Sequence, residues 1–332
     1  MKKLTYTKFK LSLVTVGPVH IGSGKTYNQK EYIFEDGYYY FPDLTILYKK
    51  LLSNQTKRLA FEKFLSSTKK ERLTSFLNNI KFADRDLGGY KIKATGYESS
   101  KNFGQLNDIS QFIRNGLNEV YIPGSSLKGA LRTILVNEHF KTDNVNWGDA
   151  DDIFNELRVS DSEPIPTKRL ILARKWDYSI KKEVANELPI LREAIKPLTT
   201  INFEITTTSE RAKTLVLKLT KYANQFYSRY KARFLDEFPN KYQQENIWYP
   251  LYLGSGSGLW TKVDYYHVKI DEIKRRTPRR MNMKRNGALK LTKSKPIKYA
   301  LTTKDGREEK VLIKNKEHLY EMGKCGFKIK EV

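Results

Sequence analysis

Residues 121–132 read YIPGSSLKGALR, and this stretch sets the plan of the chain. Pro123-Gly124 predicts a turn at the end of a short strand. The apolar spacing after the turn predicts a helix from Ser125 to about Phe140. A strand that passes directly into a helix through a glycine-rich turn is therefore the local unit to look for elsewhere in the sequence.

The start of this helix is a candidate anion site. We expect Ser125 or Ser126 to be the N-cap, so that free backbone amides face the same space as Lys128 and Arg132. Simple capping without a ligand is the alternative. Gly129 inside the helix costs about 1 kcal/mol relative to alanine, which predicts that another backbone approaches it closely.

Strand and helix patterns alternate on both sides of this unit. Alternation predicts strands at 9–16 and 201–206, and Asp36-Gly37 predicts a hairpin. Apolar spacing of three and four predicts a helical insert at about 43–80, and a short helix is expected near 317–322. The sequence therefore predicts an α+β protein of two units, 1–197 and 198–332, each compatible with a βαββαβ plan.

Composition restricts the class of protein. The 332 residues carry 61 Lys+Arg against 37 Asp+Glu, a net charge of +24, and 39% are hydrophobic. That hydrophobic content excludes a disordered polycation, and the single Cys325 excludes an internal disulfide framework. No apolar run approaches the length of a membrane span, so we expect a cytoplasmic protein.

Positive charge is concentrated in a basic stretch at about 274–298. Between Glu272 and Asp305 the sequence contains no acidic residue. Pro278 and Pro296 interrupt any long helix, which argues against an amphipathic membrane helix and favours nucleic acid as the partner. A solvated loop is the alternative. The predicted phosphate-binding residues are Arg275, Arg276, Arg279, Arg280, Lys284 and Arg285.

A first glycine-rich segment follows the first predicted strand. Its end, Gly24-Lys25-Thr26, imitates a nucleotide-binding phosphate loop, but Val19 occupies the position of the required first glycine and a strand, not a helix, follows. Backbone without side chains can still approach a phosphate or a sugar closely, although an ordinary tight turn is the alternative. The candidate RNA-binding residues here are His20, Gly22, Ser23, Gly24 and Lys25.

A third glycine-rich segment lies between predicted strands late in the chain. Trp260 and Lys262 follow it and could supply the stacking and charge that single-stranded RNA binding uses. A flexible linker is the alternative. The candidate residues of the segment itself are Gly254, Ser255, Gly256, Ser257 and Gly258.

Catalytic patterns are sparse. His20 could act as a general base toward a ribose 2′-hydroxyl, but no partner for it is visible in the sequence. The acidic residues Asp149, Asp151 and Asp152 lack calcium-loop spacing and are expected to precede a helix at Ile153. We therefore predict no catalytic residue, no metal and no cofactor.

The chain resembles the RAMP superfamily of CRISPR proteins, and in particular a subunit of the type III-A Csm effector. The resemblance lies in the three glycine-rich segments and in Arg158-Val159-Ser160-Asp161-Ser162. The resemblance covers both halves of the chain in the same order. It implies two ferredoxin-like, RRM-related domains, the first with the helical insert, whose glycine-rich loops hold RNA backbone.

The resemblance also implies partners. A subunit of this kind caps the CRISPR RNA on its 3′ side, contacts other Csm subunits, especially the repeated RAMP backbone subunit, and supports guide maturation with a host trimming nuclease. The backbone subunit cuts target RNA with an aspartate after its first glycine-rich loop, where this chain has Lys25-Thr26-Tyr27-Asn28. A metal-independent endoribonuclease for CRISPR repeat RNA and an RNA-binding protein unrelated to CRISPR remain the alternatives.

Overall fold

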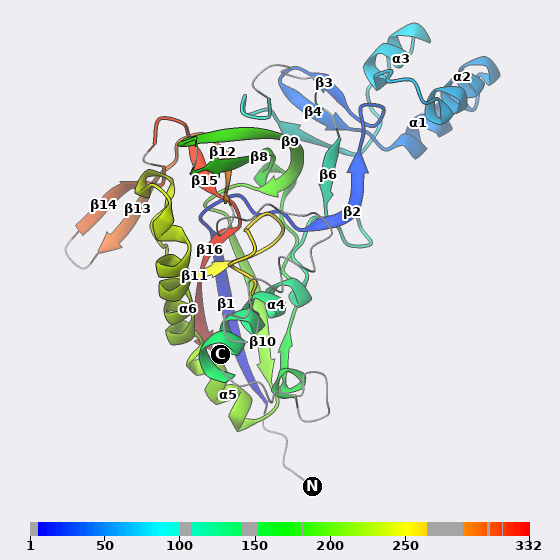
Figure 1. Cartoon of the computed structure of the whole chain (residues 1–332). Helices are drawn as coiled ribbons and strands as arrows, with labels where there is room; N and C mark the ends of the chain where they lie inside the picture. The colour runs from blue at the N-terminus through cyan, green and yellow to red at the C-terminus, as the bar shows by residue number, and fades with distance from the viewer. Residues whose placement is uncertain are drawn as a thin grey trace, which may run out of the picture.

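The computed structural model describes residues 6–99, 106, 108–140, 152–180, 182–263, 288–303, 306–313 and 315–332. Strands and helices are mixed along the whole chain, which confirms the predicted α+β class (Figure 1). Two large sheets form the body, and a smaller unit that carries helices α1 to α3 extends from one end of it.

The first large sheet is antiparallel throughout and contains the first predicted strand at its centre. Phe9, Leu11 and Leu13 alternate with more exposed residues, so that one face of this strand is buried. In spatial order the strands are β11 (Tyr249–Tyr252), β16 (Lys324–Glu331), β1 (Thr7–Thr15), β10 (Thr200–Thr207) and β7 (Leu157–Val159).

Three helices cover the apolar face of this sheet. Helix α4 contributes Leu127 and Leu131 to the same core as Phe9 and Phe203, and the later helices contribute Phe226 among others. The helices are α4 (Gly124–Leu135), which continues as a π-helix at Val136–Phe140, α5 (Glu210–Leu217) and α6 (Leu219–Arg233).

The second large sheet is antiparallel except where β6 and β9 run parallel. A second core, which includes Tyr230, Phe234 and Trp260, packs against residues of β8 and β12. In spatial order the strands are β15 (Leu319–Glu321), β12 (Leu289–Lys293), β8 (Leu170–Ser179), β9 (Val184–Ile195), β6 (Ile109–Phe112) and β2 (Gly22–Tyr27).

The smaller unit contains the predicted hairpin and the predicted helices. Asp36 and Gly37 have φ values of 50° and 75°, the left-handed conformation that a two-residue hairpin turn requires. Three helices lie within residues 43–80, where helical spacing predicts them, and their place as an insert in a first ferredoxin-like domain stays a prediction. The elements are β3 (Ile33–Glu35), β4 (Tyr38–Phe41), β5 (Tyr90–Lys93), α1 (Leu44–Leu51), α2 (Gln55–Ser66) and α3 (Leu73–Asn79).

The expected helix near 317–322 is wrong. Strand β15 forms there instead, because Leu319 pairs with Lys293 of β12 and Glu321 is buried. The remaining elements are a hairpin of β13 (Lys298–Thr303) and β14 (Gly306–Val311) and the short helices Ile153–Glu156, Thr167–Arg169, Leu235–Glu237 and Asn240–Tyr242. Asp152 caps the first of these, accepting from the amide of Phe154 at 2.9 Å, as its place before Ile153 predicts.

Both large sheets contain strands from either side of residue 197. β1 pairs with β10 and β16, and β8 pairs with β12, so strand pairing does not follow the expected division of the chain. Two separate ferredoxin-like units, 1–197 and 198–332, therefore stay a prediction.

Candidate nucleic-acid interface

The first and third glycine-rich segments lie against each other. The amide of Ser255 donates to the carbonyl of His20 at 2.7 Å. Gly254 has φ +81°, and a Cβ on it would stand 2.3 Å from the His20 carbonyl oxygen. Glycine is therefore required at 254, because the two backbones meet there without room for a side chain.

A turn at residues 321–324 joins these two segments, and the sequence analysis missed it. The amide of Gly323 donates to the carbonyl of Pro18, and the Gly323 carbonyl accepts from the amide of Leu253, both at 2.8 Å. Gly323 has φ +80°. Gly323, in the sequence Glu321-Met322-Gly323-Lys324, was the local sequence signal for this turn.

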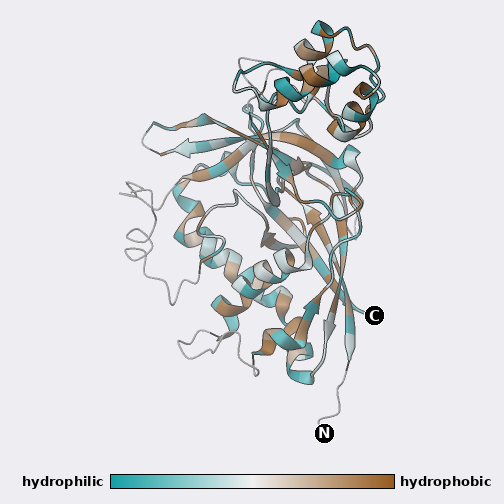
Figure 2. Cartoon of the chain, turned by 90° about the vertical axis from the view of Figure 1, so that its right-hand side faces the viewer, coloured by the Kyte–Doolittle hydropathy of each residue, from teal (hydrophilic) through white to brown (hydrophobic). Residues whose placement is uncertain are grey.

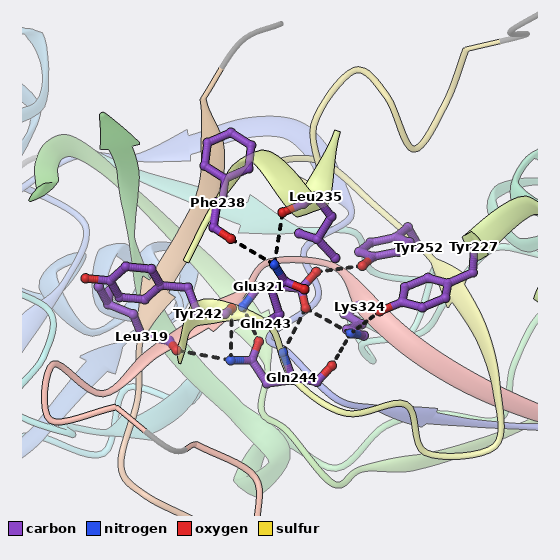
Figure 3. Close-up of polar contacts among 10 residues, drawn as sticks. All are labelled: Tyr227, Leu235, Phe238, Tyr242, Gln243, Gln244, Tyr252, Leu319, Glu321 and Lys324. Carbon is purple, nitrogen blue, oxygen red and sulfur yellow. Dashed lines mark hydrogen bonds and ion pairs between the residues drawn. The ribbon is translucent and has the colours of Figure 1, made fainter. Parts of the chain in front are cut away.

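A buried ion pair joins the first and last residues of the turn (Figure 3). The ammonium of Lys324 lies 2.9 Å from Oε1 of Glu321, and both side chains are almost fully buried. Tyr252 donates to the other carboxylate oxygen at 2.6 Å, and the amide of Gln244 donates to Oε1 at 2.9 Å. Lys324 also donates to the Gln244 carbonyl, so this network fixes the two ends of the turn.

A second buried carboxylate, Glu193, lies under the first segment. It accepts from the amide of Phe112 at 2.8 Å, from Tyr90 and from Arg114, whose Nη2 is 3.3 Å from Oε1. Burial raises the pKa of Glu193, and the charge of Arg114 opposes that shift. The Arg114 guanidinium also stacks 4.0 Å from the centre of the Tyr90 ring.

His20 is buried and belongs to the same region. Its Nδ1 donates to the Glu193 carbonyl at 2.7 Å, and only 3% of the residue is exposed. Burial lowers the pKa of His20 to about 4, with the charge of Arg192 acting in the same direction. The prediction that the His20 side chain faces RNA is therefore corrected: its backbone carbonyl shapes the site, and its ring is part of the interior.

Arg192 is a site residue that sequence reasoning missed. It comes from β9, far from the glycine-rich segments in the chain, and its Nη1 lies 3.4 Å from the Ser255 carbonyl. Gly256 has φ +93°, and a Cβ on it would stand 2.3 Å from Nη1 of Arg192. The guanidinium thus lies directly against the third segment, at a position where the positive φ favours glycine.

The start of α4 differs from the sequence prediction. Pro123 is the N-cap and makes no side-chain cap, so neither Ser125 nor Ser126 is the capping residue. The carboxylate of Asp161 accepts from the amide of Gly124 at 2.7 Å. This acid already neutralises part of the positive helix end, which weakens the expected anion site.

Lys128 and Arg132 also point elsewhere than predicted. The Lys128 ammonium donates to the Phe154 carbonyl at 2.6 Å, and burial lowers its pKa. The Arg132 guanidinium lies 5.3 Å from the centre of the Phe154 ring. Lys128 and Arg132 lie about one and two turns into α4. Their side chains therefore contact Phe154 in the short helix at 153–156 and do not face the space in front of the N-terminus of α4.

A cleft of about 290 Å³ lies between α4 and the third segment. Apart from the adjoining backbone of α4, no atom lies within 4 Å of the place where a Gly129 Cβ would be, so the expected close backbone approach is wrong there and occurs at Gly124 instead. Lys262 lines the cleft, and its ammonium donates to the Gly254 carbonyl of the same segment at 2.7 Å. The lining residues are Ser125, Ser126, Gly129, Ala130, Thr133, Tyr252, Leu253, Gly254, Thr261 and Lys262.

The remaining candidate residues fall into three groups. Gly22, Ser23, Gly24 and Lys25 lie on β2, at one edge of the second sheet, where Ser23 donates to Gln111 at 3.0 Å and Lys25 is exposed. Trp260 is 3% exposed and packs against Phe234, so it has no free face on which a base could stack, which corrects that prediction. The six residues Arg275, Arg276, Arg279, Arg280, Lys284 and Arg285 lie outside the described residues.

Neither a metal site nor a membrane span is found in the described part of the chain. Among those residues no cluster of three or more His, Cys, Asp or Glu side chains has a geometry that could hold a metal ion. Within the same ranges no helix has the length and apolarity needed to cross a bilayer.

The sequence is similar to known proteins of one family. The sequence model of the RAMP superfamily matches residues 12–320. The chain is 46% identical to the CRISPR system protein Csm5 of Streptococcus thermophilus over 99% of both chains, and 29% identical to Csm5 of Enterococcus italicus over 80% of this chain and 82% of that protein.

Two solved structures have the same fold. A chain of the cryo-EM structure of a Csm, crRNA and target RNA ternary complex from a type III-A CRISPR-Cas system superposes with a TM-score of 0.67 and 15% identity, over 96% of this chain and 100% of that chain. The crystal structure of Csm5 from T. onnurineus superposes with a TM-score of 0.55 and 18% identity, over 75% and 90%.

Proposed function

The chain belongs to the RAMP superfamily and, within it, to the Csm5 proteins; from that premise we propose that it is an RNA-binding structural subunit of a type III-A Csm effector ribonucleoprotein. It binds the CRISPR RNA at the guide's 3′ side, contacts other Csm subunits, especially the repeated RAMP backbone subunit, and supports guide maturation in antiviral defence. A host trimming nuclease is a further expected partner.

The observation that carries this proposal is that the glycine-rich segment at the start of α4 and the third glycine-rich segment line one cleft. Ser125, Ser126 and Gly129 line one wall, and Gly254 and Lys262 line the other. Hydroxyls and backbone groups can bind phosphate oxygens and ribose 2′-hydroxyls without reading bases. Lys262 then adds sequence-independent charge, as does the basic stretch at 274–298.

We also propose that the subunit is not an enzyme. The rival function, cleavage of CRISPR repeat RNA, needs a base that reaches the 2′-hydroxyl. His20 was the candidate, and its ring is buried and donates to the Glu193 carbonyl. The nearest acid after the first segment, Glu31, accepts from the amide of Asn28 at 2.9 Å.

Filling the cleft tests the proposal. Gly129→Leu places a side chain into open space and improves helix propensity, so the fold should be retained or stabilised. We expect at least about a tenfold loss of affinity for single-stranded CRISPR RNA in a filter-binding assay, because the leucine side chain fills part of the cleft that the RNA backbone would enter.

Gly116→Leu is the matched control. Gly116 also has open space around its Cβ position but lies outside the cleft, so this variant should bind like the wild type. Equal affinities of the two variants would refute the cleft as the binding site. The same reactions, run in EDTA with repeat RNA, should leave the RNA intact; cleavage that disappears in His20→Ala would favour the endoribonuclease.

A further inference from the structure

A pocket of about 400 Å³ lies where the smaller unit meets the second large sheet. In Figure 2 the smaller unit lies at one end of the body. Its strand β5 contacts both β8 and the short helix at 167–169. The lining comes from these elements, from β4, and from the chain just after β9 and β12. A pocket of this volume has the size of a small-molecule site.

One part of the lining is an apolar wall, made by Ala94, Leu170, Ile171 and Ile297. Leu170 and Ile171 are buried at the start of β8, and the other two are half-buried. Small-molecule sites typically combine such a wall with a few polar groups that fix the ligand. The wall therefore favours a ligand that has an apolar or aromatic part.

Tyr38, the first residue of β4, gives the pocket an aromatic ring. The residue is 38% exposed, and within the described part of the chain no other ring or cation stacks on it. It lies directly opposite Lys93 of β5, so a positive charge adjoins the ring. A nucleic-acid base can stack on a tyrosine ring that is accessible in this way.

The charged residues of the lining are all lysines. None of them forms an ion pair with another described residue. Burial, together with the charges of Arg169 and Lys168, lowers the pKa of Lys196. The acid nearest in the chain to this wall, Glu98, is buried and accepts from the amide of Gly96 at 2.9 Å. Positive charge without a balancing acid favours an anionic ligand. The lining lysines are Lys93, Lys168, Lys196 and Lys295.

Hydrogen bonds fix the backbone at two of these lysines. The amide of Lys196 donates to the carbonyl of Arg169 at 2.9 Å. The hydroxyl of Tyr320 donates to the carbonyl of Lys295 at 2.9 Å. Both lysines therefore leave rigid positions at the ends of strands, although their ammonium groups have no acidic partner among the described residues.

The combination of groups selects the class of ligand. The hydroxyls of Thr167 and Ser294 also line the pocket, and within the described ranges they make no hydrogen bond. A fatty acid would use the apolar wall and one lysine, and would leave both hydroxyls and the other lysines unused. An inorganic polyphosphate would use only the lysines. A base, a sugar and a phosphate together match the ring and wall, the hydroxyls and the lysines.

We propose that this pocket binds a nucleoside phosphate, with the base against Tyr38 and the apolar wall and the phosphates among the four lysines. The ligand can be a free nucleotide or one nucleotide of an RNA strand, because both present the same groups. The proposal does not rest on the proposed function, since the pocket shares no residue with the cleft beside α4.

Isothermal titration calorimetry of the full chain tests the base and the phosphates separately. ATP should bind at least about tenfold more tightly than adenosine or tripolyphosphate, because each fragment reaches only part of the pocket. Tyr38→Ala should weaken ATP about tenfold and leave tripolyphosphate unchanged. Tyr6→Ala, which removes another exposed tyrosine outside the pocket, is the control.

A second pair of variants tests the charge. Lys196→Met retains most of the apolar stem and should weaken ATP about tenfold. Lys63→Met on α2 removes the same charge outside the pocket and should bind ATP like the wild type. Lys168 is exposed, so Lys168→Met provides the same test if Lys196→Met does not fold.

The outcomes decide between site and source. Tripolyphosphate binding as tight as ATP binding, or equal ATP affinity in Tyr38→Ala and Tyr6→Ala, would overturn the proposal. Displacement of ATP by poly(U) would assign the pocket to a nucleotide of RNA, and ATP binding that poly(U) leaves unchanged would assign it to a free nucleotide. Gly129→Leu should bind ATP like the wild type, so the cleft and this pocket are tested independently.

Discussion

Two buried carboxylates support the glycine-rich segments, and they are neutralised in different ways. Glu321, under the turn at 321–324, is paired with the ammonium of Lys324. Glu193, under the first segment, is bonded to Arg114 and to the hydroxyl of Tyr90. Burial raises the pKa of Glu193, so a proton can also neutralise it. Each carboxylate accepts from one cation, one tyrosine hydroxyl and one backbone amide, so the networks differ mainly in the cation: a buried ammonium beside Glu321, and beside Glu193 a guanidinium that also stacks on the Tyr90 ring.

The largest effect is expected from Lys324→Met. It leaves the Glu321 carboxylate buried without its cation, which should cost about 3–5 kcal/mol of unfolding free energy. Urea denaturation measures this. The double variant Glu321→Gln with Lys324→Met should recover most of the loss, because it removes both charges. A loss below about 1 kcal/mol in the single variant would show that the Glu321 network does not depend on its buried cation.

A pH series tests the region of the first segment. The pKa of His20 is lowered from 6.5 to about 4 by burial, so the unfolded chain binds the proton first. Stability from His20 is therefore present above about pH 6.5 and is lost as the pH falls toward 4, by about 3 kcal/mol in total.

His20→Asn removes this titration. The asparagine amide can still donate to the Glu193 carbonyl, as Nδ1 of His20 does. We expect urea denaturation to show a smaller loss of stability between about pH 7 and about pH 4 in the variant than in the wild type. Identical pH profiles would mean that His20 is protonated as readily in the folded protein as in the unfolded chain.

Tyr90→Phe should have the smallest effect of the three. It removes the hydroxyl that bonds Glu193 and that lies 3.1 Å from the hydroxyl of Tyr27. Arg114 and the Phe112 amide remain, so the expected cost is about 2 kcal/mol. Thermal and urea unfolding measure it.

The control for Tyr90→Phe is Tyr48→Phe. The Tyr48 hydroxyl bonds Glu62 at 3.0 Å on the exposed surface of the helical unit. Its loss should change stability by less than about 0.5 kcal/mol. Similar losses in both variants would contradict the view that the buried carboxylate needs shared partners.

Local patterns in the sequence were sufficient for most elements. Alternation at 9–16 corresponds to β1, Asp36-Gly37 forms the turn between β3 and β4, and three helices occupy 43–80. Each of these depends on neighbouring residues only, so periodicity and turn chemistry decide it. The pairing of β1 with β16 could not be predicted, because the two strands lie at opposite ends of the chain.

The sequence predicted only part of the candidate site, because the rest of the site depends on contacts between residues far apart in the chain. Glycine at 254 is required by a contact with His20, and nothing near it in the chain points to that distant partner. Trp260 and His20 lie beside glycines, which suggested exposure, but tertiary packing buries both. Arg192 carries no local signal, since its role comes from the position of β9 beside the third segment.

The place of β1 between β10 and β16 has a consequence for biosynthesis. The first strand leaves the ribosome early, yet one of its two neighbours is translated only at residues 324–331. High contact order of this kind slows folding, and until β16 arrives one hydrogen-bonding edge of β1 stays open. Chains interrupted before Lys324 would lack that strand and the end of the turn at 321–324, so such products could neither close the sheet nor arrange the glycine-rich segments.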